Sequence, residues 1–233
     1  MSFFNSDEPL IRFKQEALDV QDLRGLLRIN CQLGSTRLFS RLYTRIDQTF
    51  LVWGVITAVI FAIAQFSTVN WQDQAIIWSI FTVAGVGLMS CLTWFWVRVE
   101  QLRWVVYTWA VLMLLGVVLT DGGIFLGWGW AVPNLCQLWL GLSAVGYLLT
   151  GWGLRSRTFM LAGTVHVIGI AALPYFATVP FLFSGSIIAG TLLFLSEVQW
   201  DMRPPSATAV ISAEELAFNR AQYELRTGKS LAL

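Results

Sequence analysis

The chain has 233 residues, 56% of them hydrophobic and only 12% charged, with a formal net charge of +1. A soluble domain is about half apolar and about a quarter charged, so this composition excludes an ordinary soluble globular protein. It predicts an all-α polytopic membrane protein whose first partner is the lipid bilayer. We expect no nucleic-acid partner.

Apolar runs long enough to cross the bilayer follow one another from residue 48 onward. A helix needs about 17–25 apolar residues to span a hydrocarbon core of about 30 Å. Runs of this kind predict six spans, at 48–67, 75–97, 104–120, 133–154, 158–177 and 180–199. The chain then divides into an N-terminal arm (1–46), a six-helix transmembrane domain (47–200) and a C-terminal tail (201–233).

The basic residues support the same division. Of the 15 Lys and Arg, seven precede the first span, two each lie between spans two and three and between spans four and five, and four follow span six. The other three loops hold none. Because Lys and Arg collect in cytoplasmic loops, both termini are predicted to be cytoplasmic.

Targeting and redox chemistry give weaker signals. About 45 mostly polar residues precede the first apolar run, so a cleavable signal is not expected and span one is predicted to be an uncleaved anchor. The three cysteines show no CxxC spacing, so neither a disulfide nor a metal site is predicted. A bacterial inner membrane is the default location, with a thylakoid membrane as the alternative.

The arm ends in a basic segment, STRLFSRLYTRID. Arg37, Arg41 and Arg45 recur every four residues beside an apolar stripe. This spacing predicts a basic amphipathic helix, with Ser35 or Thr36 as its N-cap, that lies on anionic inner-leaflet lipid. Docking of a cytoplasmic partner is the alternative use of the same surface.

The tail is predicted to contain a second short helix. Pro204 and Pro205 end the sixth span, because proline cannot continue a helix. Ser212 and Glu215 have the spacing of a capping box, and Gly228 is a suitable C-terminal stop. A capped helix is therefore expected between them, with a mobile tail of only fractional helix as the alternative.

Acidic residues near the predicted spans are few. Glu197, at the inner end of span six, is expected to form an ion pair with one of the arginines at the same depth. These arginines are Arg98, Arg103, Arg155 and Arg157. We interpret such a pair as a structural clasp of helix ends rather than as a proton or ion relay.

His166 is the only histidine and lies about 12 Å into span five, near mid-membrane. Gly163 and Gly169 flank it at helical spacing, so another helix can approach closely. The first interpretation is interhelical packing with a hydrogen bond to the hydroxyl of Tyr147 or Ser143. No cofactor is predicted on this interpretation. The alternatives are axial ligation of a tetrapyrrole, haem or chlorophyll, and a proton relay.

Small residues also repeat in span six, in the sequence FSGSIIAG. Gly185 with Ala189, and Ser186 with Gly190, are separated by the four positions typical of close helix packing. Span five is the expected partner, because a short turn joins it to span six.

The loop at 121–132 is rich in glycine and tryptophan. It is interpreted as interfacial, with Trp128 and Trp130 at headgroup level, or as a re-entrant segment.

Three functional hypotheses follow. The first is a non-catalytic assembly, scaffold or regulatory subunit of a larger membrane complex, with other subunits or a second copy as partners. The second is a carrier or channel for a neutral or apolar solute, which requires a cavity that reaches mid-membrane. The third is a hydrophobic-cofactor protein that uses His166. We find no nucleophile with a nearby base, so an enzyme is not predicted.

Overall fold

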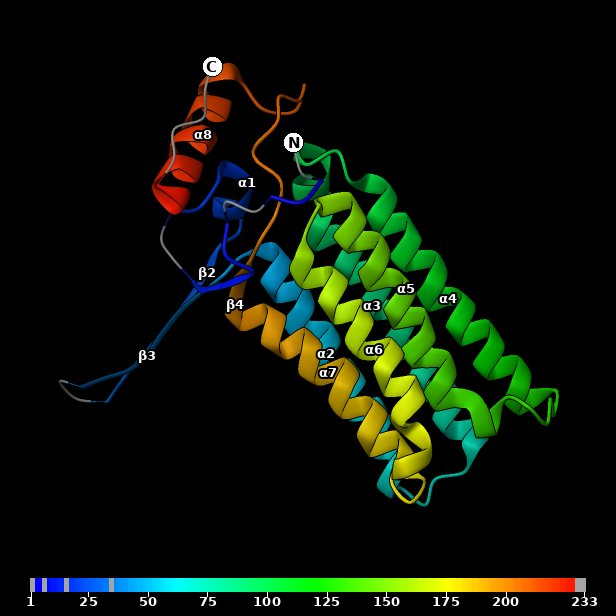
Figure 1. Cartoon of the computed structure of the whole chain (residues 1–233). Coiled ribbons are helices and arrows are strands. Elements are labelled where there is room, and N and C mark those ends of the chain that lie inside the picture. Colours follow the sequence, from blue (N-terminus) through cyan, green and yellow to red (C-terminus); the bar gives the residue numbers. More distant parts are fainter. Residues whose placement is uncertain (1–2, 6–7, 15–16, 34–35, 229–233) are drawn as a thin grey trace.

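The computed structural model describes residues 3–5, 8–14, 17–33 and 36–228 (Figure 1). It is mostly helical, at 72%, and contains six helices that are long and apolar enough to cross a membrane. This confirms the prediction of a multi-pass membrane protein. The helices are α2 (Arg45–Phe66), α3 (Trp71–Val99), α4 (Arg103–Phe125), α5 (Leu135–Leu154), α6 (Arg157–Ala172) and α7 (Pro180–Glu197). The 3₁₀ turns η1 (Val132–Asn134) and η2 (Leu173–Phe176) extend α5 at its start and α6 at its end.

Local sequence signals set where several of these helices begin. Thr44 caps α2: its hydroxyl accepts from the backbone N–H of Asp47, and the Asp47 carboxylate accepts from the N–H of Thr44 at 2.8 Å. Asn70 caps α3 in the same way. These side chains satisfy N–H groups that have no partner inside the helix.

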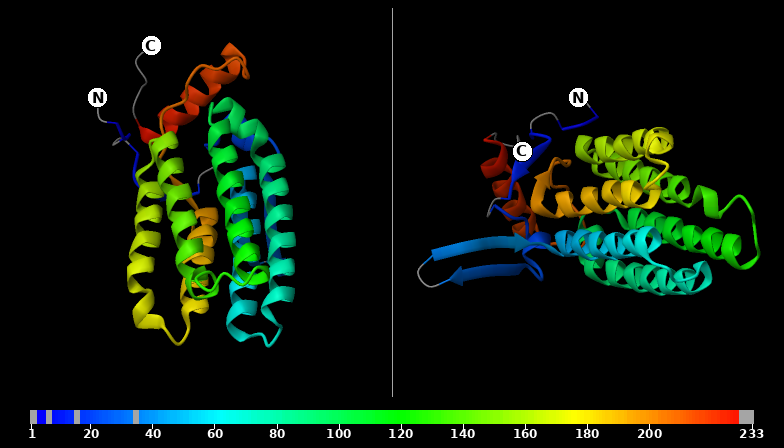
Figure 2. Two further views of the ribbon diagram at one scale, coloured as in Figure 1. Left: turned by 90° about the vertical axis from the view of Figure 1, so that its right-hand side faces the viewer. Right: turned by 90° about the horizontal axis from the view of Figure 1, so that it is seen from below.

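The six helices form a bundle in which chain neighbours are antiparallel. α2 packs on α3 and α7, α4 packs on α3 and α5, and α6 packs on α5, while α7 also contacts α5 and α6. The helices therefore surround a common centre (Figure 2). Since their number is even, the segments before α2 and after α7 lie at the same end of the bundle (Figure 1).

Glycines allow the closest helix contacts. A Cβ added to Gly185 of α7 would lie 2.5 Å from Cβ of Phe61 on α2, and one added to Gly163 of α6 would lie 2.6 Å from Cγ of Leu148 on α5. A Cβ added to Gly169 of α6 would lie 2.7 Å from Cδ1 of Ile187 on α7. The expected partner of Gly185 was span five, but the small residues Gly185 and Ala189 are buried where α7 packs along α2. Ser186 and Gly190 face outward.

The two terminal segments fold together into what we call the terminal cap, the described residues of 3–43 and 198–228. Strand β1 (Ile11–Phe13) pairs antiparallel with β4 (Val198–Trp200). Helix α1 (Val20–Leu23) lies near α8 (Ala213–Thr227). α8 has the predicted capping box of Ser212 and Glu215, and it ends at Gly228, which has a positive φ of 66°.

The predicted amphipathic helix in the arm is wrong. Strands β2 (Leu27–Leu33) and β3 (Thr36–Tyr43) form an antiparallel hairpin there, and Arg45 is already the first residue of α2. The two sheets of the terminal cap also mean that the chain is not purely α-helical. A spacing of four residues places side chains on one face of a helix and equally on one face of a strand, so the arginine pattern did not discriminate between them. Ser35 lies outside the described residues, and Thr36 begins β3 rather than capping a helix.

The glycine-rich segment opposite the cap is shorter than predicted. α4 continues through Asp121 to Phe125, and Ser79 of α3 donates to both carboxylate oxygens of Asp121 at 2.8 and 3.0 Å. Trp128 and Trp130 follow, exposed and stacked with ring centroids 6.2 Å apart.

Candidate functional site

An internal cavity of about 160 Å³ lies at the centre of the bundle. Side chains of α2, α3, α4, α5 and α7 form most of its wall. About 10–15 Å³ of such space accommodates one water molecule, so the cavity has room for roughly ten waters or an equivalent organic molecule.

The cavity is long rather than round. On α2 its lining begins at Ile46, beside the terminal cap, and ends at Ala64, near the opposite end of the helix. At 1.5 Å per residue these positions are about 27 Å apart, close to the hydrocarbon thickness of about 30 Å. The shape therefore suits an extended molecule.

The wall is apolar. None of the residues that border the cavity is Asp, Glu, Lys, Arg or His. The hydroxyls of Thr49, Thr93 and Thr150 donate to the backbone carbonyls of Arg45, Met89 and Gly146 in their own helices. Tryptophans supply much of the remaining surface, namely Trp53, Trp78, Trp96, Trp109, Trp139 and Trp200. Such a wall recognises shape and apolar surface rather than charge.

Three polar groups on residues that border the cavity have no partner within the described residues. They are the indole N–H groups of Trp53 and Trp78 and the hydroxyl of Tyr147. By contrast, the indole N–H of Trp109 donates to Thr150 at 2.9 Å, and that of Trp139 donates to Thr120 at 3.2 Å. A buried donor without a partner is costly, so these three groups mark positions where an acceptor would be favourable.

His166 is fully buried and lies outside the cavity wall. Its Nδ1 is 2.8 Å from the carbonyl oxygen of Ala162, one turn earlier in α6, so Nδ1 carries the proton and donates. The expected hydrogen bond to the hydroxyl of Tyr147 or Ser143 is not formed. Instead, the rings of Tyr147 and His166 pack with centroids 4.9 Å apart. Nε2 has no partner among the described residues.

The terminal cap covers one end of the cavity. Trp200 of β4 and Trp96 of α3 border the cavity at that end, and their rings contact each other with centroids 6.3 Å apart. Phe159, at the start of α6, packs edge-on against Trp200 at 4.8 Å. The apolar interior of the bundle is thus continuous with the inner face of the cap.

Buried charged groups hold the cap to the helix ends. The fully buried carboxylate of Asp201 accepts from the backbone N–H groups of Arg157 and Thr158 at the start of α6, and from the side chains of Ser156, Arg157 and Thr158. Burial alone would raise the pKa of Asp201, but these hydrogen bonds hold that pKa below its usual value. Asp201 therefore acts as an N-terminal cap for α6 supplied from a distant part of the chain.

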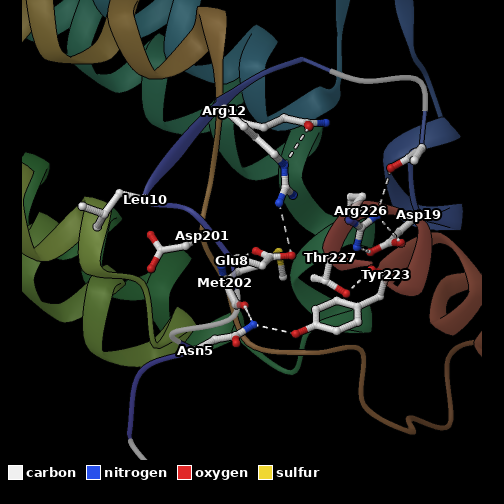
Figure 3. Close-up of polar contacts among 12 residues, drawn as sticks. Asn5, Glu8, Leu10, Arg12, Asp19, Asp201, Met202, Tyr223, Arg226 and Thr227 are labelled. Atoms are coloured by element: carbon white, nitrogen blue, oxygen red, sulfur yellow. Dashed lines mark hydrogen bonds and ion pairs between the residues drawn. The ribbon is translucent and has the colours of Figure 1, made fainter. Parts of the chain in front are cut away.

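A second set of contacts joins the two ends of the chain (Figure 3). Arg226 of α8 donates to Asp19 at 2.8 and 3.2 Å. Asn5 donates to the hydroxyl of Tyr223 at 2.7 Å, and Glu8 pairs with Arg12 at 3.4 Å. The pairs of Arg226 with Asp19 and of Asn5 with Tyr223 connect residues 207 and 218 positions apart, whereas Glu8 and Arg12 are four positions apart within the N-terminal segment.

Two carboxyl groups lie at the contact between α1 and the end of α3. Asp22 accepts from the indole N–H of Trp96 at 3.0 Å, and Glu100 accepts from Gln21 at 2.9 Å. Burial raises the pKa of Asp22 to about 7, aided by the nearby charge of Asp19. Burial also raises the pKa of Glu100 to about 7, although the charge of Arg203 opposes the shift.

The predicted partners of Glu197 are wrong. Glu197 accepts from the hydroxyl of Tyr43 at 2.7 Å and lies 3.5 Å from Nε of Arg41. Arg157 pairs with Asp201 at 2.9 Å, and Arg155 lies over the ring of Phe3 at 5.3 Å. Arg98 and Arg103 form no ion pair with a described residue. Ion pairs do hold the helix ends, but residues of the two terminal segments supply one partner of each pair.

The cavity and cap together can bind and enclose an apolar molecule. The described residues contain no group of three or more His, Cys, Asp or Glu that could hold a metal ion. Sequence reasoning missed the cavity, because its wall comes from five helices and each contributes ordinary apolar residues. The only available signal was the concentration of tryptophan and threonine along α2, α3 and α5. Comparison with protein-family models, with curated proteins and with solved structures finds no match to this chain.

Proposed function

We propose that the chain is a non-catalytic integral membrane protein that binds, and as a carrier transfers, an elongated apolar molecule held inside its six-helix bundle. The observation that carries this proposal is the apolar cavity, whose lining follows α2 for about 27 Å. A carrier for an apolar solute requires a cavity that reaches mid-membrane, and a lining that follows most of the length of α2 supports this proposal.

The wall also favours a class of ligand. Its apolar surface suits a hydrocarbon or isoprenoid body, and the absence of ionisable side chains from the wall disfavours a charged solute. The unpartnered donors of Trp53, Trp78 and Tyr147 favour a molecule that carries carbonyl or ester oxygens, because such oxygens accept hydrogen bonds without bearing charge.

The charge distribution supports an orientation. All Lys and Arg of the described residues lie in the terminal cap or at the helix ends next to it. On the positive-inside rule the cap faces the cytoplasm, with a bacterial inner membrane as the default location.

The experiment is photo-crosslinking of the purified protein with a diazirine-bearing methyl ester of a 16-carbon fatty acid, followed by peptide mapping. Thr82 of α3 borders the cavity and is buried, whereas the next residue, Val83, is 52% exposed on the outer face. Thr82→Phe should fill part of the cavity and reduce labelling of cavity residues. Val83→Phe is the matched control and should leave it unchanged. Equal labelling of all three proteins, confined to outward-facing residues, would refute the proposal.

A second candidate is an assembly subunit of a larger membrane complex. The observation in its favour is that Ser186 and Gly190 form an outward-facing pair of small residues on α7, and a Cβ added to Gly190 meets nothing within 4 Å. Small residues at this spacing allow another transmembrane helix to approach closely. Gly190→Leu should then weaken association in native mass spectrometry, and an unchanged mass distribution would remove this candidate.

A further inference from the structure

The β2–β3 hairpin and the residues next to it carry an unusual concentration of positive charge. Residues 23–46 contain five arginines, Arg24, Arg28, Arg37, Arg41 and Arg45, and no Asp, Glu or Lys. Asp22 and Asp47 flank this segment on either side. Arg24 and Arg41 form ion pairs with Glu215 and Glu197, but the segment as a whole keeps an excess of positive charge. Such an excess attracts a partner of the opposite sign.

The base of the hairpin is fixed where the first span begins. Lys14 pairs with Asp47 in the first turn of α2 at 2.8 Å, and it also donates to the carbonyl oxygen of Leu42 in β3 at 2.9 Å. Only Thr44, the N-cap, separates β3 from α2. Because no linker intervenes, the hairpin leaves the bundle at the depth where α2 enters the membrane.

The hairpin extends sideways from this point, across the direction of the bundle helices rather than along it (Figure 1). It forms a sheet of two strands, with Leu27 opposite Tyr43 and Ile29 opposite Arg41. Leu27 and Ile29 are 47% and 40% exposed, and Arg28 on the other face is also exposed. A two-stranded hairpin with apolar side chains in water is only marginally stable, so it needs a surface to rest on.

We propose that the β2–β3 hairpin is a membrane-surface element that binds anionic phospholipid headgroups of the leaflet into which α2 begins. The hairpin lies edge-on in the headgroup layer, so that Leu27 and Ile29 on one face and Arg28 on the other all contact lipid. The position at the membrane boundary and the excess of arginine in this segment favour headgroups over a protein partner. This inference is independent of the ligand in the cavity.

The experiment uses the full-length protein, one copy per nanodisc, in discs of neutral phosphatidylcholine or of phosphatidylcholine with phosphatidylglycerol. Hydrogen exchange of amides 28–42 is measured in both. Each arginine near an anionic surface contributes about 1 kcal/mol, which corresponds to about a fivefold change. Exchange should be at least about fivefold slower in the anionic disc, and high salt should abolish the difference.

The variant that isolates the cause is Arg28→Gln combined with Arg37→Gln. The control of equal charge change is Arg103→Gln combined with Arg220→Gln, both outside the hairpin. The hairpin variant should lose most of the protection in anionic discs, whereas the control should retain it. Equal exchange in neutral and anionic discs overturns the proposal. Protection that appears only when a membrane protein extract is added also overturns it, because the hairpin would then bind a protein.

Discussion

The guanidinium of Arg226, near the C-terminal end of α8, donates to both carboxylate oxygens of Asp19, the N-cap residue of α1. Both side chains are nearly inaccessible, at 6% and 5% exposure. This contact joins residues 207 positions apart and fixes the C-terminal helix on the N-terminal segment. The two ends of the chain therefore form one unit over the bundle.

Substitution of one residue of the Arg226–Asp19 pair should destabilise the contact between the two ends of the chain. Arg226→Met leaves the Asp19 carboxylate buried without its cation, and breaking a buried pair in this way costs about 3–5 kcal/mol. We expect faster hydrogen exchange in α1 and α8 and faster proteolysis of the segment 204–211, with the bundle helices unaffected. Arg220→Met on the same helix is the control. Adding Asp19→Asn to Arg226→Met should recover part of the loss, and unchanged exchange in the single variant would contradict the assigned role.

Cap stability should depend on pH through Asp22 and Glu100. Burial raises both pKa values to about 7, from ordinary values of 3.8 and 4.5. Between about pH 4 and pH 7 the folded cap thus binds more protons than the unfolded chain, and its stability falls as pH rises through this window. The charged groups that act on the two carboxyls are Asp19, Arg203 and Arg226.

The measurement is the protection of α1 and α8 against exchange, corrected for the intrinsic pH effect. Protection should be greater at pH 5.5 than at pH 8. Asp22→Asn with Glu100→Gln should flatten the profile over this range. Below about pH 4 the hydrogen bonds of Asp201 should weaken, because its pKa is held below 3.8 and stability is lost as that carboxylate becomes protonated. Protection that increases from pH 5.5 to pH 8 would contradict the assignment.

Tyr147→Phe tests the unpartnered hydroxyl beside the cavity. The hydroxyl is buried without a partner, which costs about 1–3 kcal/mol, so its removal should stabilise the ligand-free protein by about 1 kcal/mol or more. The same change should weaken binding of decyl-benzoquinone by about twofold to tenfold and leave binding of decylbenzene unchanged, because only the quinone carries acceptor oxygens. Thermal unfolding and native mass spectrometry measure the two effects. A destabilised variant would show that the hydroxyl has a partner.

The spans were predictable from sequence because their signals are local. A run of about twenty apolar residues needs no knowledge of its neighbours, and Ser212 with Glu215 forms a capping box within a single turn. The start of α2 carries a similar local signal, the capping box of Thr44 and Asp47. The spacing of the arginines favours a different helix, one that continues through this position.

The hairpin and the cap contacts were harder to predict. The alternation of LRINCQL over residues 27–33 is a strand pattern, but it lies in a mostly polar arm in which the spacing of the arginines favours a helix. The partners of Asp201, Arg226 and Glu197 are 44, 207 and 154 positions away, so no local pattern specifies them. The cavity depends on how five helices pack against one another. No local stretch of the sequence specifies that packing.

His166→Ala tests the role of the lone histidine. The imidazole fills space against Tyr147 and donates to Ala162, so its removal leaves a void and should destabilise α5–α6 packing by about 2–4 kcal/mol. If packing is its role, an absorption spectrum of gently purified protein should be the same before and after the substitution. His166→Gln, which keeps an N–H donor, should lose less stability than His166→Ala. A Soret or chlorophyll band that disappears in both variants would instead make the unpartnered Nε2 an axial ligand.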